Sequence, residues 1–198
     1  MENVLVVPTA SLGDITARDG LITGREQEVM SLIAAESLFL PRSIAEESPE
    51  YRQIIPYVAI VRGDEVFATR RLNQGGERRL HGKVSLGVGG HINEIDRADG
   101  SWLMNGLLRE LAEEVSVADF GRLTLRGLIN NSSNAVGNVH LGFFFTLTTG
   151  GAVAVRETEK LSGSFLPMAE LSDHTENMET WSQIIAPELM KLWKTGLL

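Results

Sequence analysis

The sequence predicts an α/β or α+β fold in which a mixed sheet lies between helices. Apolar or alternating runs of strand length are separated by turn residues, and longer segments repeat apolar residues at helical intervals. Hydrophobic residues make up 43% and charged residues 22% of the 198 residues, so the chain can bury a sizeable core. Periodicity alone does not decide between the two classes.

The first fifty residues form an arm that precedes a main domain of residues 51–198. In order, the arm's expected features are a strand at Val4–Val7, a helix from about Arg25 to Leu38 with capping-box spacing between Thr23 and Glu26, and a loop bracketed by Pro41 and Pro49. The helix repeats Val29, Leu32 and Ile33 on one side. It must bury this stripe against its own main domain or against a second copy of the chain.

The main domain begins with a hairpin and ends with a helix. In order, we expect strands at Ile55–Val61 and Val66–Arg70 around the turn Arg62–Glu65, a strand at Lys83–Val88 ending in Gly89-Gly90, a helix at Trp102–Val115, strands at about Leu123–Ile129, Val139–Thr148 and Ala152–Arg156, a short strand near Phe165, and a last helix from about Met178. Pro187 either kinks this last helix or opens a second helical segment.

Composition excludes several classes of function. A formal charge of −8 and a pI near 5.1 argue against a sequence-independent grip on nucleic acid, although a small phosphorylated substrate stays compatible. The absence of cysteine excludes disulfides, thiolate catalysis and cysteine-ligated zinc. Because the N-terminus lacks signal-peptide features and no stretch approaches the length of a membrane span, we expect a soluble, cytoplasmic protein.

The segment Arg109–Val115 carries the most informative pattern. Glu110, Glu113 and Glu114 share one face of the expected helix, and their like charges repel unless something offsets them. The opposing face is expected to consist of Met104, Leu107, Leu108, Leu111 and Val115. A hard cation such as Mg²⁺ would offset the repulsion, and Arg109 could hold one carboxylate by two hydrogen bonds. The alternative is a solvated acidic helix face.

Residues 89–117 resemble the box of the Nudix (MutT-like) hydrolases, a Gly-Gly turn followed by a helix bearing R-E-U-x-E-E-x-G-U, where U is aliphatic. The matching residues are Gly89-Gly90 and Arg109-Glu110-Leu111-Ala112-Glu113-Glu114-Val115-Ser116-Val117. The resemblance implies a mixed sheet between helices, and metal binding by Glu110, Glu113, Glu114 and the Gly89 carbonyl. It covers roughly residues 55–195 and leaves the arm unexplained.

Two departures from the family pattern stand out. The box has an acidic residue between the glycines and the arginine, and the expanded loop 91–100 offers Glu94, Asp96 or Asp99 for that role without deciding among them. Ser116 replaces the glycine that ends the helix, which would cost about 1 kcal/mol if the backbone there is left-handed. Wider phrases resemble a subgroup of predicted MutT-family phosphoesterases, which gives no substrate.

Other residues are candidates for substrate contact. The basic residues before the glycine pair would meet substrate phosphates, or else form a charged hairpin edge; they are Arg70, Arg71, Arg78, Arg79, His81 and Lys83. His91, after the pair, is a candidate for the cleft, and the alternative is a histidine that hydrogen-bonds a loop carbonyl. We expect a structural role for His140 and assign none to His174. In MutT-like proteins a glutamate from the loop that holds Glu157 and Glu159 approaches the metal, and Glu159 matches that position better.

These residues predict a Mg²⁺-dependent hydrolase that cleaves X-P-O-P-Y by attack of water, with Mn²⁺ able to replace Mg²⁺. The catalytic candidates are Glu113, Glu114, Arg109 and Glu159; the metal candidates are Glu110, Glu113, Glu114 and Gly89; the substrate candidates are Arg70, Arg71, Lys83 and His91. The general base stays open among Glu113, Glu114 and Glu159. The alternatives are a catalytically silent nucleotide sensor and, less favoured, an isomerase. We also expect a homodimer in which Arg25 or Arg42 borders the partner's cleft.

Overall fold

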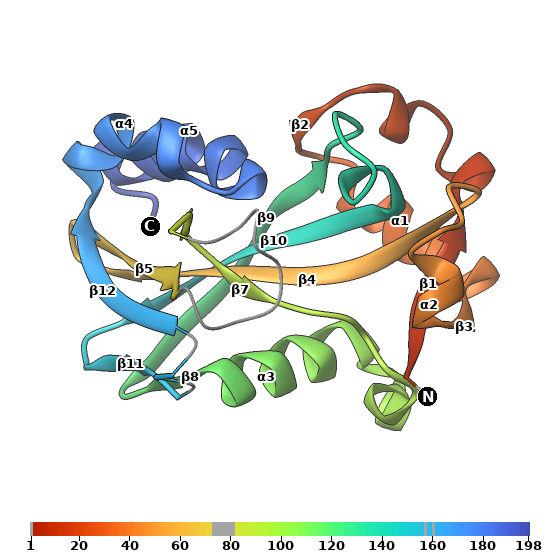
Figure 1. The fold of residues 1–198 in the computed structure, drawn as a ribbon, viewed down its shortest axis with the longest axis horizontal. Coiled ribbons are helices and arrows are strands. Elements are labelled where there is room, and N and C mark those ends of the chain that lie inside the picture. The colour runs from red at the N-terminus through yellow and green to blue at the C-terminus, as the bar shows by residue number, and fades with distance from the viewer. Residues whose placement is uncertain (1, 73–81, 157, 160) are drawn as a thin grey trace. The chain divides into compact units, whose positions relative to one another are not determined.

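The computed structural model describes residues 2–72, 82–156, 158–159 and 161–198 (Figure 1). These residues form two compact units. The first consists of Met1–Tyr57, Gly89–Glu110 and Leu125–Phe144, and the second of Val58–Val88, Leu111–Thr124 and Phe145–Leu198. The chain therefore passes repeatedly between the units, and the predicted arm belongs to the first of them together with the Gly-Gly turn.

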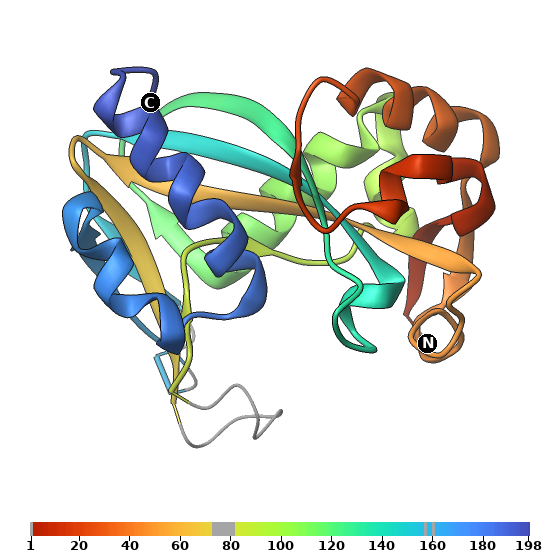
Figure 2. The same ribbon diagram turned by 90° about the horizontal axis from the view of Figure 1, so that it is seen from above.

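In the first unit, the arm forms strands that pair with later parts of the chain. The elements that lie wholly here are β1 (Asn3–Pro8), the 3₁₀ helix η1 (Thr9–Ala17), β2 (Gly20–Ile22), α1 (Glu26–Glu36), β3 (Leu38–Pro41), α2 (Arg42–Ala45), the 3₁₀ helix η3 (Glu94–Gly100) and the 3₁₀ turn η4 (Gly137–Val139). Strand β1 pairs antiparallel with β3 and, through Val6 opposite Gln53, with β4. Strand β2 pairs with β9, and Figure 2 shows α1 beside η1.

In the second unit, β5 lies at the centre of an antiparallel group. The elements here are β5 (Glu65–Arg71), β6 (Val84–Ser85), β8 (Val115–Val117), β11 (Val153–Val155), β12 (Leu161–Pro167), the 3₁₀ turn η5 (Met168–Glu170), α4 (Leu171–His174), the 3₁₀ turn η6 (Thr175–Asn177) and α5 (Thr180–Lys194). Strand β5 pairs with β4, β6 and β12, and β8 forms a separate two-stranded sheet with β11. Helix α5 packs beside α4, with Ile185 and Leu189 fully buried.

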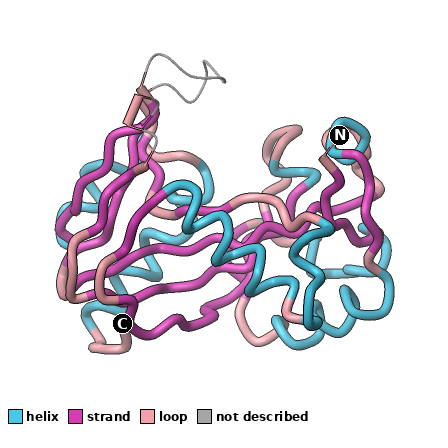
Figure 3. The backbone as a smooth tube through the Cα atoms, turned by 90° about the horizontal axis from the view of Figure 1, so that it is seen from below, coloured by secondary structure: helices cyan, strands magenta, loops and turns pink. Residues whose placement is uncertain are grey.

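Five elements contribute residues to both units. They are β4 (Tyr51–Arg62), β7 (Val88–Gly89), α3 (Trp102–Glu114), β9 (Phe120–Asn130) and β10 (His140–Thr149). Strands β4, β10 and β9 are hydrogen-bonded neighbours in that order. The predicted class is confirmed, because the fold is a mixed sheet flanked by helices. Figure 3 colours the helical and strand segments along the described chain. None of the described helices is long and apolar enough to cross a membrane.

Most of the longer predicted elements are confirmed within a few residues, and several local predictions are wrong. Helix α1 begins after Arg25 without a side-chain cap, so the predicted capping box does not form. The expected loop after Pro41 begins with helix α2. The predicted strand Lys83–Val88 divides into β6 and β7, while α5 continues through Pro187 as one helix.

The predicted faces of α3 need a correction. The buried leucines of α3 are Leu103, Leu107 and Leu111, each at most 7% exposed. Met104 and Leu108 are 37% and 40% exposed. Leu107 and Leu103 precede Glu110 by three and seven residues, so helical geometry places them on its side of the helix. The carboxylates therefore lie beside the buried stripe of α3 and not opposite it.

Candidate active site at the glycine turn and helix α3

The carboxylate of Glu110 lies directly against the backbone of Gly90. A Cβ atom added at Gly90 would come within 2.2 Å of the Glu110 Cδ atom, and one added at Gly89 within 2.3 Å of the Pro56 carbonyl oxygen. Any larger residue at position 90 would therefore displace this carboxylate. The glycine pair brings the turn and Glu110 together, in the place where the family resemblance expects a metal.

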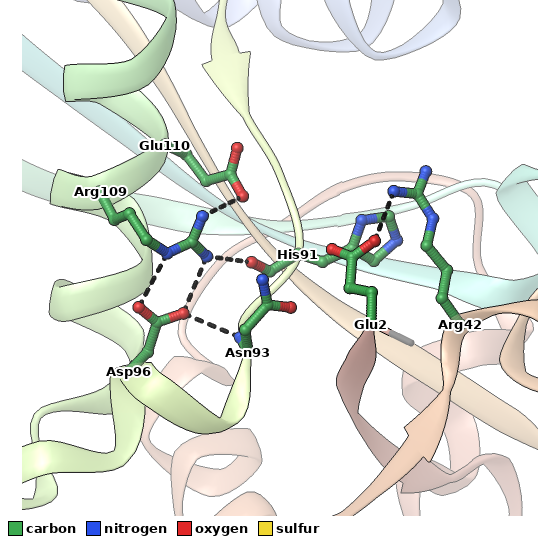
Figure 4. Close-up of polar contacts among 7 residues, drawn as sticks. All are labelled: Glu2, Arg42, His91, Asn93, Asp96, Arg109 and Glu110. Atoms are coloured by element: carbon green, nitrogen blue, oxygen red, sulfur yellow. Dashed lines mark hydrogen bonds and ion pairs between the residues drawn. The ribbon is translucent and has the colours of Figure 1, made fainter.

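Arg109 connects Glu110 to the loop before the helix (Figure 4). Its guanidinium donates two hydrogen bonds to Asp96, at 3.0 and 2.8 Å, and one to Glu110 at 2.8 Å. A further bond of 2.7 Å goes to the main-chain oxygen of His91. The hydrogen bonds to Asp96, followed by those to Glu110, raise the pKa of Arg109 above its ordinary value. Arg109 is thus a permanent cation that fixes one acidic side chain of α3.

Of the three acidic candidates in the loop, Asp96 is the one whose described side chain contacts Arg109. Its side chain is 4% exposed, and besides Arg109 it accepts a hydrogen bond of 2.8 Å from the main-chain nitrogen of Asn93. Glu94 instead accepts a bond from Asn3, and the side chain of Asp99 lies outside the described part of the structure.

The extra residues of the expanded loop lie between Asp96 and the start of helix α3, and most of them belong to the 3₁₀ helix η3. The side-chain nitrogen of Asn105 in α3 donates to the main-chain oxygens of Asp96 and Ala98, both at 3.0 Å. The insertion is therefore held to the helix by its backbone. It leaves the pair of Arg109 and Asp96 intact.

Glu113 and Glu114 occupy the last turn of α3, in the second unit. Glu113 is exposed and Glu114 is half-buried. Helical periodicity places both on the side of α3 that carries Glu110. Among the residues that the structure describes, no three His, Cys, Asp or Glu side chains are already grouped as a metal site. The donor set still fits a hard divalent cation, because all three groups are carboxylates and Gly90 leaves room for the first of them.

Ser116 does not strain the backbone after α3. It lies in the extended strand β8, opposite Ala154 of β11. Asp119, with φ of 57°, is the one non-glycine residue with positive φ in the described ranges. The expected cost of a left-handed serine therefore does not arise, since the chain leaves the helix directly into a strand.

The basic candidates that can be placed lie at one end of the strand pair β5 and β6. Arg70 and Arg71 are exposed, and Arg71 contacts Glu179 at 3.3 Å. The Lys83 ammonium donates to the main-chain oxygen of Glu176 at 2.9 Å. Two of these cations are thus held by the segment before α5. The remaining members of the predicted cluster, Arg78, Arg79 and His81, lie outside the described residues.

His91 and His140 form a pair that sequence reasoning missed. Their Nε2 atoms lie 3.5 Å apart, and His140 Nδ1 lies 2.6 Å from the main-chain oxygen of Val136. Burial lowers the pKa of His91 to about 3 and lowers that of His140 as well. Both rings are therefore neutral near pH 7. No local signal could have revealed the pair, because the two residues are far apart in the chain.

The other predicted positions show no contact that assigns a role. Glu159 is exposed in the turn before β12, and Glu157 lies outside the described residues. His174 ends helix α4. The participation of Glu159 in catalysis stays a prediction.

Comparisons with known proteins agree with this geometry. No family model matches the sequence. Protein YmaB of Bacillus subtilis (strain 168) is 42% identical over 169 residues, which cover 81% of this chain and 82% of YmaB. The crystal structure of Tm1382, provisionally described as a Nudix hydrolase, is 33% identical in sequence and matches with a TM-score of 0.84 over 96% of this chain and 100% of its own.

A more distant match was solved with a ligand. The Nudix domain of NrtR from Shewanella oneidensis, crystallised with ADP ribose, is 19% identical and matches with a TM-score of 0.54 over 74% of this chain and 89% of its own. At this identity the likeness shows the fold alone.

Proposed function

Because this chain belongs to the Nudix hydrolase family, we propose that it cleaves the diphosphate bond of a nucleoside diphosphate-linked substrate by Mg²⁺-dependent attack of water. The observation that carries the proposal is the placement of the Glu110 carboxylate against Gly90, where Arg109 holds it. In that arrangement Glu110, the first proposed metal ligand of helix α3, lies beside the Gly89-Gly90 turn and is oriented by Arg109.

The residues divide into metal-holding and proton-handling groups. Glu110, Glu113, Glu114 and the Gly89 carbonyl would hold the metal, and Arg109 would orient Glu110. A bound divalent ion would neutralise charge developing on the diphosphate oxygens and lower the pKa of the attacking water. Glu113, Glu114 or Glu159 would accept the proton of that water. Positioning and electrostatics are most of what a protein supplies to phosphoryl transfer.

The substrate is proposed to be a small nucleotide. Arg70, Arg71, Lys83 and His91 would bind its phosphates or ribose, and His91 would do so as a neutral ring. ADP-ribose is the first compound to test, since a Nudix domain of the same fold was crystallised with it.

We further propose a cytoplasmic location, where nucleotides and Mg²⁺ are available, and a homodimer. Exposed apolar side chains of Ile95, Met104 and Leu108 favour association.

The alternative of a catalytically silent sensor is not favoured. All three box glutamates are present in the sequence, and the arginine that orients the first of them is fully engaged. A sensor would need neither feature.

A hydrolysis screen with chromatographic detection of the products tests the proposal, because cleavage of a diphosphate bond by water yields two phosphorylated products. ADP-ribose, dinucleoside polyphosphates, NADH and oxidised nucleoside triphosphates would be incubated with the chain, with and without Mg²⁺. We expect turnover of at least one compound, rising toward mildly alkaline pH, restored by Mn²⁺ and abolished by exhaustive chelation. Turnover that survives chelation, or no turnover of any compound, would contradict it.

A further inference from the structure

The first residues of the chain lie along the loop that joins the glycine pair to η3. The main-chain nitrogen of Leu5 donates to the oxygen of Ile92 at 2.9 Å, and Val4 forms a β-bridge with Asn93. The side-chain nitrogen of Asn3 donates to Glu94 at 3.2 Å. Three consecutive residues of the loop are therefore held by three consecutive residues of the arm.

The same loop is held on its other side by Arg109. This residue donates to the main-chain oxygen of His91, and its partner Asp96 accepts from the nitrogen of Asn93. Figure 4 shows the loop between these contacts and the arm residues Glu2 and Arg42. A displacement of the loop would thus move an acceptor of Arg109, and Arg109 in turn orients Glu110.

An ion pair anchors the start of the arm at this place. The guanidinium of Arg42 contacts Glu2 at 3.0 Å and Glu46 at 2.8 Å, and its main-chain nitrogen donates to the oxygen of Glu2 at 2.9 Å. The side chains of Arg42 and Glu2 are 45% and 38% exposed. Ion pairs this exposed add little to folding stability, so their removal would mainly alter local geometry.

We propose that Glu2 and Arg42 are positioning residues for the metal site. Their ion pair holds the arm against residues 91–94, and this loop holds Arg109 in the position that presents Glu110 beside Gly90. The proposal rests on the proposed function, because it assigns the site formed by Glu110 to a divalent metal. It extends that function to a part of the chain outside the family box.

The test is a titration of the full chain, without an added N-terminal tag, with Mn²⁺. Electron paramagnetic resonance measures the unbound Mn²⁺. We expect Arg42→Gln and Glu2→Gln each to raise the half-saturating Mn²⁺ concentration by about tenfold, the low end of the effect of losing an outer-shell partner of a metal site. Arg42→Lys, which retains the charge, should recover part of the affinity. The thermal midpoint of each variant should fall by less than about 4 °C.

Arg25→Gln is the matched control. Arg25 belongs to the same arm and also contacts two carboxylates, those of Asp14 and Glu28. In the described part of the chain, the hydrogen bonds of these three side chains do not involve residues 91–94. Its replacement should leave Mn²⁺ affinity unchanged. Equal losses in the Arg25 and Arg42 variants would overturn the proposal, as would wild-type affinity in both Arg42→Gln and Glu2→Gln.

The two proposals fail in different ways. A wild-type chain that binds Mn²⁺ but hydrolyses no diphosphate contradicts the proposed function, while the binding comparison still decides the role of Arg42 and Glu2. A wild-type chain that binds no Mn²⁺ removes the metal site and overturns the positioning role with it.

Discussion

The three glutamates of α3 lie in different surroundings, although the sequence presents them as one acidic face. The side chain of Glu110 is 15% exposed and is held by Arg109, so its charge is offset in the folded chain. Glu113 is exposed and Glu114 half-buried. Replacing Glu113 or Glu114 therefore leaves the hydrogen bond from Arg109 to Glu110 in place.

We predict that Glu113→Gln and Glu114→Gln each lower Mg²⁺-dependent turnover by about a hundredfold or more, since each removes a proposed ligand or base. The free energy of unfolding should stay unchanged or rise by a few tenths of a kcal/mol, because one charge leaves a repulsive cluster. Turnover and chemical denaturation measure the two effects. Glu47→Gln, at an exposed position outside α3, is the control, and near-normal turnover in either α3 variant would remove that glutamate from the site.

The half-buried His91 makes the free energy of unfolding depend on pH. Burial lowers its pKa from 6.5 to about 3, so the unfolded chain binds a proton in this range that the folded chain does not. Above pH 6.5 neither state of the chain is protonated at His91, and the free energy of unfolding carries no penalty from it. As the pH falls from 6.5 toward 3, the free energy of unfolding decreases by at most about 1.4 kcal/mol per pH unit. We predict that His91→Gln, studied in the presence of a chelator, flattens this slope in denaturation curves. An identical slope in both proteins would show that His91 is not protected from protonation.

At the scale of elements, the sequence predicted those with a long and regular pattern. The hairpin of β4 and β5, helix α3 and helix α5 each repeat apolar residues over enough positions for the period to be clear. Strands β2 and β3 and helix α2 have three or four residues each, so they contain no readable period. They form because partners far along the chain pair with them or pack on them.

The candidate site follows the same division. The residue types and their helical spacing predicted the acidic side chains of α3. Which residue Arg109 binds depends on how η3 folds back, and the pairing of His91 with His140 depends on the tertiary fold. The expectation for Arg42 concerned a partner's cleft. Its contact with Glu2, beside the loop that holds His91 and Asn93 of the same chain (Figure 4), depends on the tertiary fold, and the family pattern does not extend into the arm.

The junction of the glycine turn with α3 yields a prediction of its own. Gly90→Ala introduces a Cβ within 2.2 Å of the Glu110 carboxyl carbon. The carboxylate is the end of a flexible side chain, so it should move aside and the chain should still fold. We expect weaker Mn²⁺ binding by about tenfold, as for other displaced ligands, with an unchanged circular dichroism spectrum. Wild-type Mn²⁺ affinity in this variant would contradict the role of Glu110 as a ligand.

At the scale of the whole molecule, the arm is part of the first unit and not an appendage to it. Its strand β1 pairs with residues 51–53 and forms a β-bridge with Asn93, in the loop between the glycine pair and η3. Val29 and Ile33 of α1 are fully buried. The apolar stripe that suggested packing across a two-fold axis is therefore covered within its own chain. The proposed homodimer therefore uses other surfaces.

A chain that starts at Ser48 should lose its folded first unit. The truncation removes the buried side chains of Val4, Leu5, Val6, Val7, Val29 and Ile33, each at most 4% exposed. At about 1.5–3 kcal/mol for each buried aliphatic side chain, the loss of about 9–18 kcal/mol is comparable to the roughly 5–15 kcal/mol that stabilises a typical domain. We therefore expect no cooperative thermal transition and no Mn²⁺ binding from the shortened chain, measured by calorimetry and by resonance titration. Light scattering on the full chain at micromolar concentration reports the oligomeric state separately. A shortened chain that is folded and as active as the full one would show that the arm neither stabilises the unit nor positions its site.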